Sequence, residues 1–161
     1  MGKKFAKVCV SWTMGFLSIT TLLITFGAVA QEKGPMQYKV IKTQEFVKSA
    51  NPNPGERVRV GILTEKDQAK NLNGIFGSLP PASSGVQLAY HYHENRESII
   101  QILSGDATEM IEGKPIPLEP GDVIFIPPNV KHTLVNNSST QELKYMEFFS
   151  PIAPDSVQVK E

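Results

Sequence analysis

Three histidines are the residues of this 161-residue chain best suited to chemistry. His91 and His93 are separated by one residue, and His132 follows further along the chain. Residues i and i+2 of a β-strand point to the same face, so one strand could direct both of the first two imidazoles at one point. Glu97 opens the next predicted strand, where a hairpin would return its carboxylate to that face. Three imidazoles and one carboxylate suit a borderline divalent ion such as Fe, Mn, Ni, Co, Cu or Zn.

A His-x-His pair on a strand is, by itself, more often a pair of surface side chains than a pair of metal ligands. The joint pattern is more specific, because all three histidines and Glu97 stand in compatible turn and strand contexts. Gln101 shares the strand parity of Glu97 and is a second candidate for the site, the alternative being a polar residue that fills the interior. With the histidines assigned to a metal, no Ser/His/Asp arrangement is plausible.

Short β-like segments surround these residues. They are separated by Gly, Pro, Asn, Asp and Ser, which favour turns, and none shows a long helical period of apolar residues. Many short strands at close spacing are typical of a sandwich or a closed barrel. The segments are 86–93, 98–103, 107–111, 123–126, 132–135 and 143–149.

The segments before residue 85 are less regular. Residues 38–41 predict a short strand, residues 44–50 a brief helical turn, and residues 57–63 a half-buried strand, because charged and apolar residues alternate there. Residues 71–81 are rich in Asn, Gly and Pro and predict a loop with one short strand.

The first thirty residues have the pattern of a secretory signal peptide. Lys3, Lys4 and Lys7 precede an uncharged, mostly apolar run that ends in Ala-Val-Ala at position 30. We expect a secreted or periplasmic protein without stable membrane association, and the alternative is a retained N-terminal anchor. The predicted organisation is a signal peptide over 1–30, a flexible lead-in over 31–37, a β-barrel over 38–150 and a peripheral C-terminal tail over 151–161.

Composition limits the classes of function. Sixteen basic and sixteen acidic residues balance, which argues against a nucleic-acid-binding protein. With 40% hydrophobic and 20% charged residues, the chain has a globular composition. The single Cys lies at position 9, inside the predicted signal peptide, so no thiol chemistry is expected after cleavage.

The histidines stand in spacings that resemble the two motifs of the cupin family. The first motif is Gly, five residues, His, one, His, three or four, Glu, six and Gly. Gly85, His91, His93 and Glu97 fit its first four positions, while the closing glycine is expected at 104 and occurs at 105.

The second cupin motif is Gly, five residues, Pro, one, Gly, two, His, three and Asn. Gly121, Pro127, His132 and Asn136 fit it, and Asn129 replaces the central glycine. This position is expected to need a left-handed turn conformation, which Asn tolerates better than most residues.

The resemblance implies an all-β fold, the cupin double-stranded β-helix or jelly-roll barrel, with short N-terminal additions. It also implies one divalent metal ion, Fe, Mn, Ni or Zn, held by four ligands: His91, His93, Glu97 and His132. About two positions of a six-coordinate ion would stay open. By analogy with small cupins, residues 38–41 could pair with a second copy in a homodimer.

The leading functional hypothesis is an exported, metal-dependent cupin enzyme, oxygenase-like, acting on a small organic molecule. Glu97 and Gln101 are its candidate catalytic residues. The rival is a non-catalytic periplasmic module that binds or senses a metal or small ligand, and a metal-dependent lyase, decarboxylase or isomerase is a further alternative.

Overall fold

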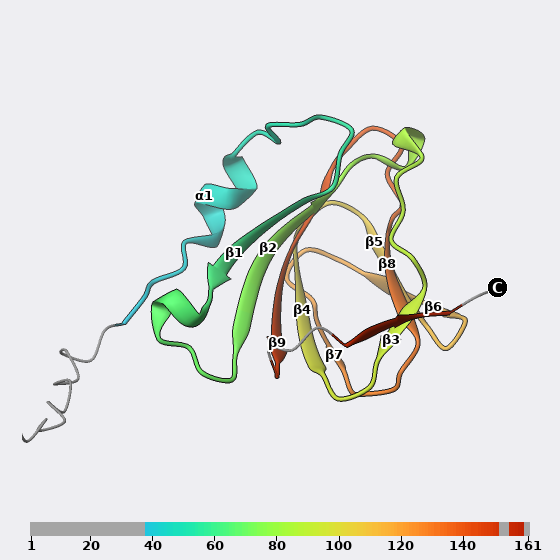
Figure 1. Ribbon diagram of the computed structural model, residues 1–161. Coiled ribbons are helices and arrows are strands. Elements are labelled where there is room, and N and C mark those ends of the chain that lie inside the picture. Colours follow the sequence, from blue (N-terminus) through green and yellow to red (C-terminus); the bar gives the residue numbers. More distant parts are fainter. Residues whose placement is uncertain (1–37, 152–154, 160–161) are drawn as a thin grey trace, which may run out of the picture. The chain divides into compact units, whose positions relative to one another are not determined.

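The computed structural model describes residues 38–151 and 155–159, which fold into two antiparallel sheets (Figure 1). One sheet has the strand order β1-β2-β9-β4-β7 and the other β10-β3-β8-β5-β6. The alternation of sheets along the chain is that of the predicted jelly-roll barrel. The strands are β1 (Val58–Leu63), β2 (Asn73–Leu79), β3 (His91–His93), β4 (Glu97–Ser104), β5 (Ala107–Ile111), β6 (Lys114–Leu118), β7 (Val123–Ile126), β8 (His132–Asn136), β9 (Leu143–Ser150) and β10 (Ser156–Gln158).

Among the residues that the structure describes, helical structure is limited to short segments. One α-helix, α1 (Thr43–Lys48), lies where the brief helical turn was predicted, and two 3-10 turns occur at Glu65–Asp67 and Ala82–Ser84. The Phe46 ring of α1 stacks on Phe76 of β2 with ring centroids 4.3 Å apart. Lys144 of β9 donates hydrogen bonds to the carbonyls of Phe46, Val47 and Ser49, which ties the C-terminal end of α1 to the sheet.

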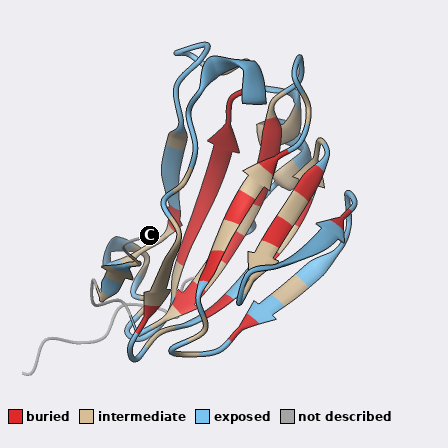
Figure 2. Cartoon of the chain, turned by 90° about the vertical axis from the view of Figure 1, so that its right-hand side faces the viewer, coloured by how far each residue is buried: buried red, intermediate tan, exposed pale blue. Residues whose placement is uncertain are grey.

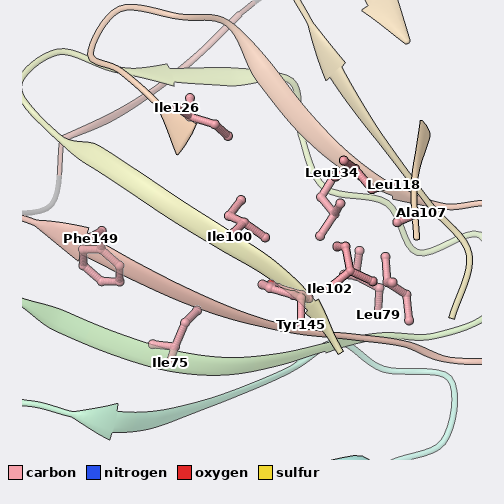
Figure 3. Packing of buried hydrophobic residues seen from close by; sticks show 11 residues of the cluster. Ile75, Leu79, Ile100, Ile102, Ala107, Leu118, Ile126, Leu134, Tyr145 and Phe149 are labelled. Carbon is pink, nitrogen blue, oxygen red and sulfur yellow. The ribbon is translucent and has the colours of Figure 1, made fainter. Parts of the chain in front are cut away.

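The core lies between the two sheets. Figure 2 shows buried positions alternating with more exposed ones along several strands, as in β4, β5 and β8, while β2 is buried along almost its whole length. Figure 3 shows the apolar side chains that fill this space, with contributions from both sheets. They are Ile75, Leu79, Ile100, Ile102, Ala107, Leu118, Ile126, Leu134, Leu143, Tyr145 and Phe149.

Three expectations about elements differ from the structure. Residues 38–41 form no strand but an exposed lead into α1. Residues 71–81 contain a seven-residue strand, β2, in place of a mainly looped segment. The C-terminal tail is not peripheral, because β10 pairs with β3 and places Ser156 opposite His93.

The predicted signal peptide and lead-in, residues 1–30 and 31–37, lie outside the described residues. Within the described part of the chain, no helix is long and apolar enough to cross a membrane.

Candidate metal centre

The three histidines converge inside the barrel. β3 and β8 are adjacent and antiparallel, and His91 is the direct cross-strand partner of His132. His93 points to the same side as His91 because the two are i and i+2 on β3. One ring nitrogen of each lies within 4.8 Å of the others, and His93 and His132 are both buried. The structure thus confirms that the sequence brings these three imidazoles together.

The Nδ1 atom of each ring faces away from the common centre. His91 Nδ1 is 2.8 Å from the carbonyl oxygen of Ala89, and His132 Nδ1 is 2.9 Å from that of Val130. His93 Nδ1 is 3.1 Å from Asp155 Oδ1. Each Nδ1 therefore donates its hydrogen, which leaves Nε2 as the unprotonated ring atom that can accept a metal ion.

Burial keeps these rings neutral. Desolvation lowers the pKa of His91 and of His132, and hydrogen bonds to backbone carbonyls oppose it. Desolvation, followed by the positive charge of Arg96, lowers the pKa of His93 from 6.5 to about 4. Because a metal ion binds neutral imidazole, the rings are in the ligating form at neutral pH without first losing a proton.

These residues fit a divalent ion. The buried Nε2 atom of His93 has no hydrogen-bond partner among the described residues. An unpartnered buried nitrogen is costly, and an ion between the three rings would satisfy it. Three neutral imidazoles are a donor set suited to Zn, Fe, Ni, Mn or Cu.

A pocket of about 180 Å³ opens over the histidines. It is smaller than the roughly 300–1,000 Å³ of sites for drug-sized ligands, so it has room only for a small molecule. Three arginines line it: Arg57 and Arg59, which are exposed, and Arg96, which is half-buried. Arg57 and Arg59 share one face of the chain because charged and apolar residues alternate over residues 57–63.

Glu147 of β9 anchors one side of the pocket. Its Oε1 accepts hydrogen bonds from Arg96 and from the Ser98 hydroxyl, the latter at 3.1 Å. Its Oε2 lies 3.7 Å from Arg59. The Arg96 guanidinium also lies over the Phe149 ring, 3.9 Å from its centroid. These contacts hold Arg96 in a single orientation beside the histidines.

Glu109 of β5 is the second carboxyl group of the pocket lining. It is fully buried, and neither of its oxygens has a hydrogen-bond partner among the described residues. Desolvation, with a smaller contribution from the charge of Glu147, raises the pKa of Glu109 from 4.5 to about 8. The group therefore carries a proton at neutral pH. Sequence analysis missed it because nothing in its local pattern separates it from a solvent-facing glutamate.

The structure does not bring Glu97 or Gln101 to the histidines, contrary to the prediction that both belong to the site. Both lie on the face of β4 opposite to Ser98 and Ile100, and neither lines the pocket. Glu97 is exposed and is absent from the group of potential ligands that the three histidines form.

The reason is a one-residue change of register in the first motif. If four residues separate His93 from the acidic position, that position falls on Ser98, and six more residues lead to Gly105 without a gap. Ser98 is buried and faces inward, so it occupies the place expected of the glutamate. The nearest carboxylate there is Glu147, which reaches Ser98 from the neighbouring strand.

The expectation for Asn129 is confirmed. Its φ is 64°, in the left-handed region, and its backbone N–H donates to the carbonyl of His93. The turn that Asn129 forms thus supports the strand carrying two of the histidines.

Comparison with known proteins agrees with this fold. A family model described as "Cupin domain" matches residues 78–149. An oxalate-binding protein of Thermotoga maritima is 30% identical over 112 residues, which cover 68% of this chain and 86% of that protein.

Solved structures show the same architecture. A predicted oxalate decarboxylase of Thermotoga maritima has 25% sequence identity and a TM-score of 0.52, over 60% of this chain and 81% of that one. A Klebsiella pneumoniae protein with a double-stranded β-helix domain has 17% identity and a TM-score of 0.60, over 78% of this chain and all of that one, a likeness of fold alone.

Proposed function

The chain belongs to the cupin superfamily, and we propose that His91, His93 and His132 hold a divalent metal ion at which a small carboxylate anion binds. The observation that carries the proposal is the placement of three arginines around the pocket that the histidines close. Against their three positive charges stand two carboxyl groups, Glu109 and Glu147, and burial raises the pKa of Glu109 to about 8. The pocket therefore favours an anionic occupant even before a cation is added.

The relatives support a carboxylate as that anion. One is an oxalate-binding protein, and a solved neighbour is described as a predicted oxalate decarboxylase. Oxalate is small enough for a pocket of about 180 Å³. An arginine fork matches the two oxygens of a carboxylate, which gives Arg96 and Arg59 a role in orienting the anion.

We further propose that the protein is an enzyme. A bound divalent ion would supply Lewis-acid or redox chemistry at the anion. A simple binder needs only the ion and the arginines, whereas this pocket also contains Glu109, a buried carboxyl group whose pKa burial raises to about 8 in the metal-free protein. Ile100 and Leu134 line the same pocket and limit the access of water.

Two reaction classes follow for such an enzyme. The first is oxygenation, for which an ion held by His91, His93 and His132 would supply redox chemistry with O₂. The second is decarboxylation, which the description of the solved Thermotoga neighbour favours. Non-catalytic carriage or sensing of the anion is the alternative function.

Calorimetry of the metal-loaded protein tests the binding step. Protein reconstituted with Fe(II), Mn(II), Ni(II) or Zn(II) is titrated with oxalate and with oxamide, a neutral analogue of similar shape. We expect oxalate to bind and oxamide to bind at least about tenfold more weakly, with Arg59→Gln weakening oxalate alone. Equal binding of both molecules, or none of either, would remove the carboxylate proposal.

Turnover is tested on the same metal forms. Oxygen consumption and CO₂ release are followed with oxalate and with a panel of small mono- and dicarboxylates. Glu109→Gln is expected to lower kcat by about 10²-fold or more while anion affinity stays within a few-fold. Anion binding without turnover in any metal form would assign the protein to the binding class.

We also propose export, with cleavage after Ala30. The support is the N-terminal pattern of three lysines, an apolar run and Ala-Val-Ala. Intact-mass measurement of the protein recovered from the extracytoplasmic fraction should give a chain that begins at Gln31. A full-length chain retained in the membrane fraction would favour the anchor.

A further inference from the structure

The C-terminal strand reaches the metal centre through one carboxylate. β10 pairs with β3 so that Ser156 lies opposite His93 and Gln158 lies opposite His91. Asp155, which precedes β10, places Oδ1 3.1 Å from His93 Nδ1 and accepts a hydrogen bond from the Asn95 backbone N–H at 2.9 Å through Oδ2. The Asp155 side chain is 11% exposed and that of His93 4%.

His93 differs in this respect from the other two histidines. Their Nδ1 atoms donate to carbonyls two residues earlier in the chain, contacts that a local backbone segment can make alone. His93 instead depends on a residue 62 positions away in sequence. That residue also lies beyond residues 78–149, the part of the chain that matches the cupin domain.

From these contacts we propose that Asp155 is the positioning residue of His93, holding the ring in the tautomer that presents an unprotonated Nε2 to the ion. The inference rests on the proposed metal binding and extends it to the C-terminal segment. A carboxylate can only accept a hydrogen bond, so Nδ1 must keep the ring proton. The carboxylate also raises the basicity of Nε2 and fixes the plane of the ring.

Replacement of Asp155 by Asn or by Ala separates positioning from plain structural support. In D155N, the amide oxygen is expected to keep accepting a hydrogen bond from the Asn95 backbone N–H, because a backbone N–H can only donate. The amide NH₂ then faces His93 Nδ1 and forces it to accept, which moves the ring proton to Nε2 and blocks ligation. In D155A, the ring has no such partner and can still adopt the ligating tautomer with the help of water.

We expect D155N to be the weaker of the two variants in metal affinity and D155A to be the weaker in thermal stability. Co(II) or Zn(II) affinity should fall about 10–100-fold in D155N and less in D155A. Melting temperature of the metal-free protein should fall more in D155A, which loses the acceptor for Asn95. Nitrogen-15 NMR of the metal-free protein should show protonated Nδ1 for His93 in the natural chain and protonated Nε2 in D155N. D155E, which keeps an acceptor, should recover part of the affinity.

Asp106→Asn is the matched control, because Asp106 is exposed, accepts from Asn137 and does not line the pocket. It should leave affinity and the His93 tautomer unchanged. If D155N binds metal as tightly as the natural chain, or if affinity simply follows melting temperature across the variants, Asp155 does not position His93. Failure of the natural chain itself to bind a divalent ion would instead overturn the proposed function, and the NMR result would still report on the tautomer.

Discussion

At the scale of single residues, the metal centre depends on which nitrogen of each ring is free. The three Nδ1 atoms donate to Ala89, Val130 and Asp155, so the three Nε2 atoms are the ones left for the ion. Loss of any one ring leaves two imidazoles, which is below the usual number of protein ligands at a catalytic site. The ligand role of each histidine can therefore be tested separately from the role first expected of Glu97.

The first prediction contrasts His132 with Glu97. His132→Ala should abolish stoichiometric binding of Zn(II) or Co(II), whereas Glu97→Gln should keep both the stoichiometry and, within about twofold, the affinity. The reason is that His132 lies in the three-ring group and Glu97 is exposed on the outer face of β4. Elemental analysis after dialysis gives the stoichiometry, and competition with a chelator gives the affinity. Loss of metal from E97Q would return Glu97 to the ligand set.

The types and spacing of the residues predict that the histidines converge, but they do not predict which carboxyl groups lie near them. Two histidines at i and i+2 share a strand face in any register, so their convergence follows from the sequence alone. Placing Glu97 required a choice between three and four residues after His93, and a shift of one residue moves a side chain to the opposite face. Glu109 and Glu147 reach the pocket, and Asp155 reaches His93, through pairing of distant strands, which no local pattern encodes.

At the scale of elements, β2 shows why a glycine-rich segment can be a central strand. Gly77 lies opposite Tyr145 of β9, and a Cβ atom on Gly77 would be 2.1 Å from Tyr145 Cζ. The glycine thus makes room for the buried Tyr145 ring, which also lines the pocket. The sequence predicts a loop with one short strand there, because glycine usually disfavours strands. The need for glycine at position 77 comes from Tyr145, a residue some seventy positions away in sequence.

The second prediction follows from this close approach. Gly77→Ala should destabilise the protein by about 1–3 kcal/mol and displace Tyr145, because the added methyl overlaps the ring. Gly61→Ala on β1 is the matched control, since its Cβ would meet only the methyl carbon of Thr64, at 3.1 Å. Chemical denaturation measures the difference in the free energy of unfolding. Equal stability of the two variants would contradict the packing seen at Gly77.

Two further strands, β6 and β10, were not predicted, each for a reason of its own. β6 contains Pro115 and Pro117, which remove backbone donors, and it is tolerated because it lies at the edge of its sheet and pairs with β5 alone. β10 has only three residues, too few for a visible alternation. The strands that were predicted, such as β4, β8 and β9, are those in which an alternation of buried and less buried positions shows in the sequence.

At the scale of the whole molecule, the buried titratable groups act on stability in opposite directions. Burial lowers the pKa of His91, His93 and His132, so the unfolded chain binds more protons than the folded one as pH falls below 6.5. Folding stability of the metal-free protein is therefore lost as pH decreases from 6.5 towards 4. Burial raises the pKa of Glu109 from 4.5 to about 8, so the folded chain binds the extra proton between these values. Stability from this group decreases as pH rises through that window.

The third prediction isolates Glu109 by comparing the natural chain with Glu109→Gln, because the histidines contribute equally to both. Between pH 6.5 and 8, the free energy of unfolding of the metal-free natural chain, taken relative to that of Glu109→Gln at the same pH, should decrease with a slope of up to about 1.4 kcal/mol per pH unit. Glu109→Gln lacks the proton that Glu109 takes up on folding, so the difference between the two profiles reports on this group alone. Urea denaturation at half-unit pH steps measures both profiles.

Glu119→Gln serves as the control, because Glu119 is exposed in a turn and should leave the slope unchanged. Parallel profiles for the natural chain and Glu109→Gln would mean that Glu109 is ionised in the folded protein at neutral pH. The pocket would then hold two negative carboxylates beside its arginines, which would weaken its preference for an anion and take away the proton on which the proposed catalytic role of Glu109 depends.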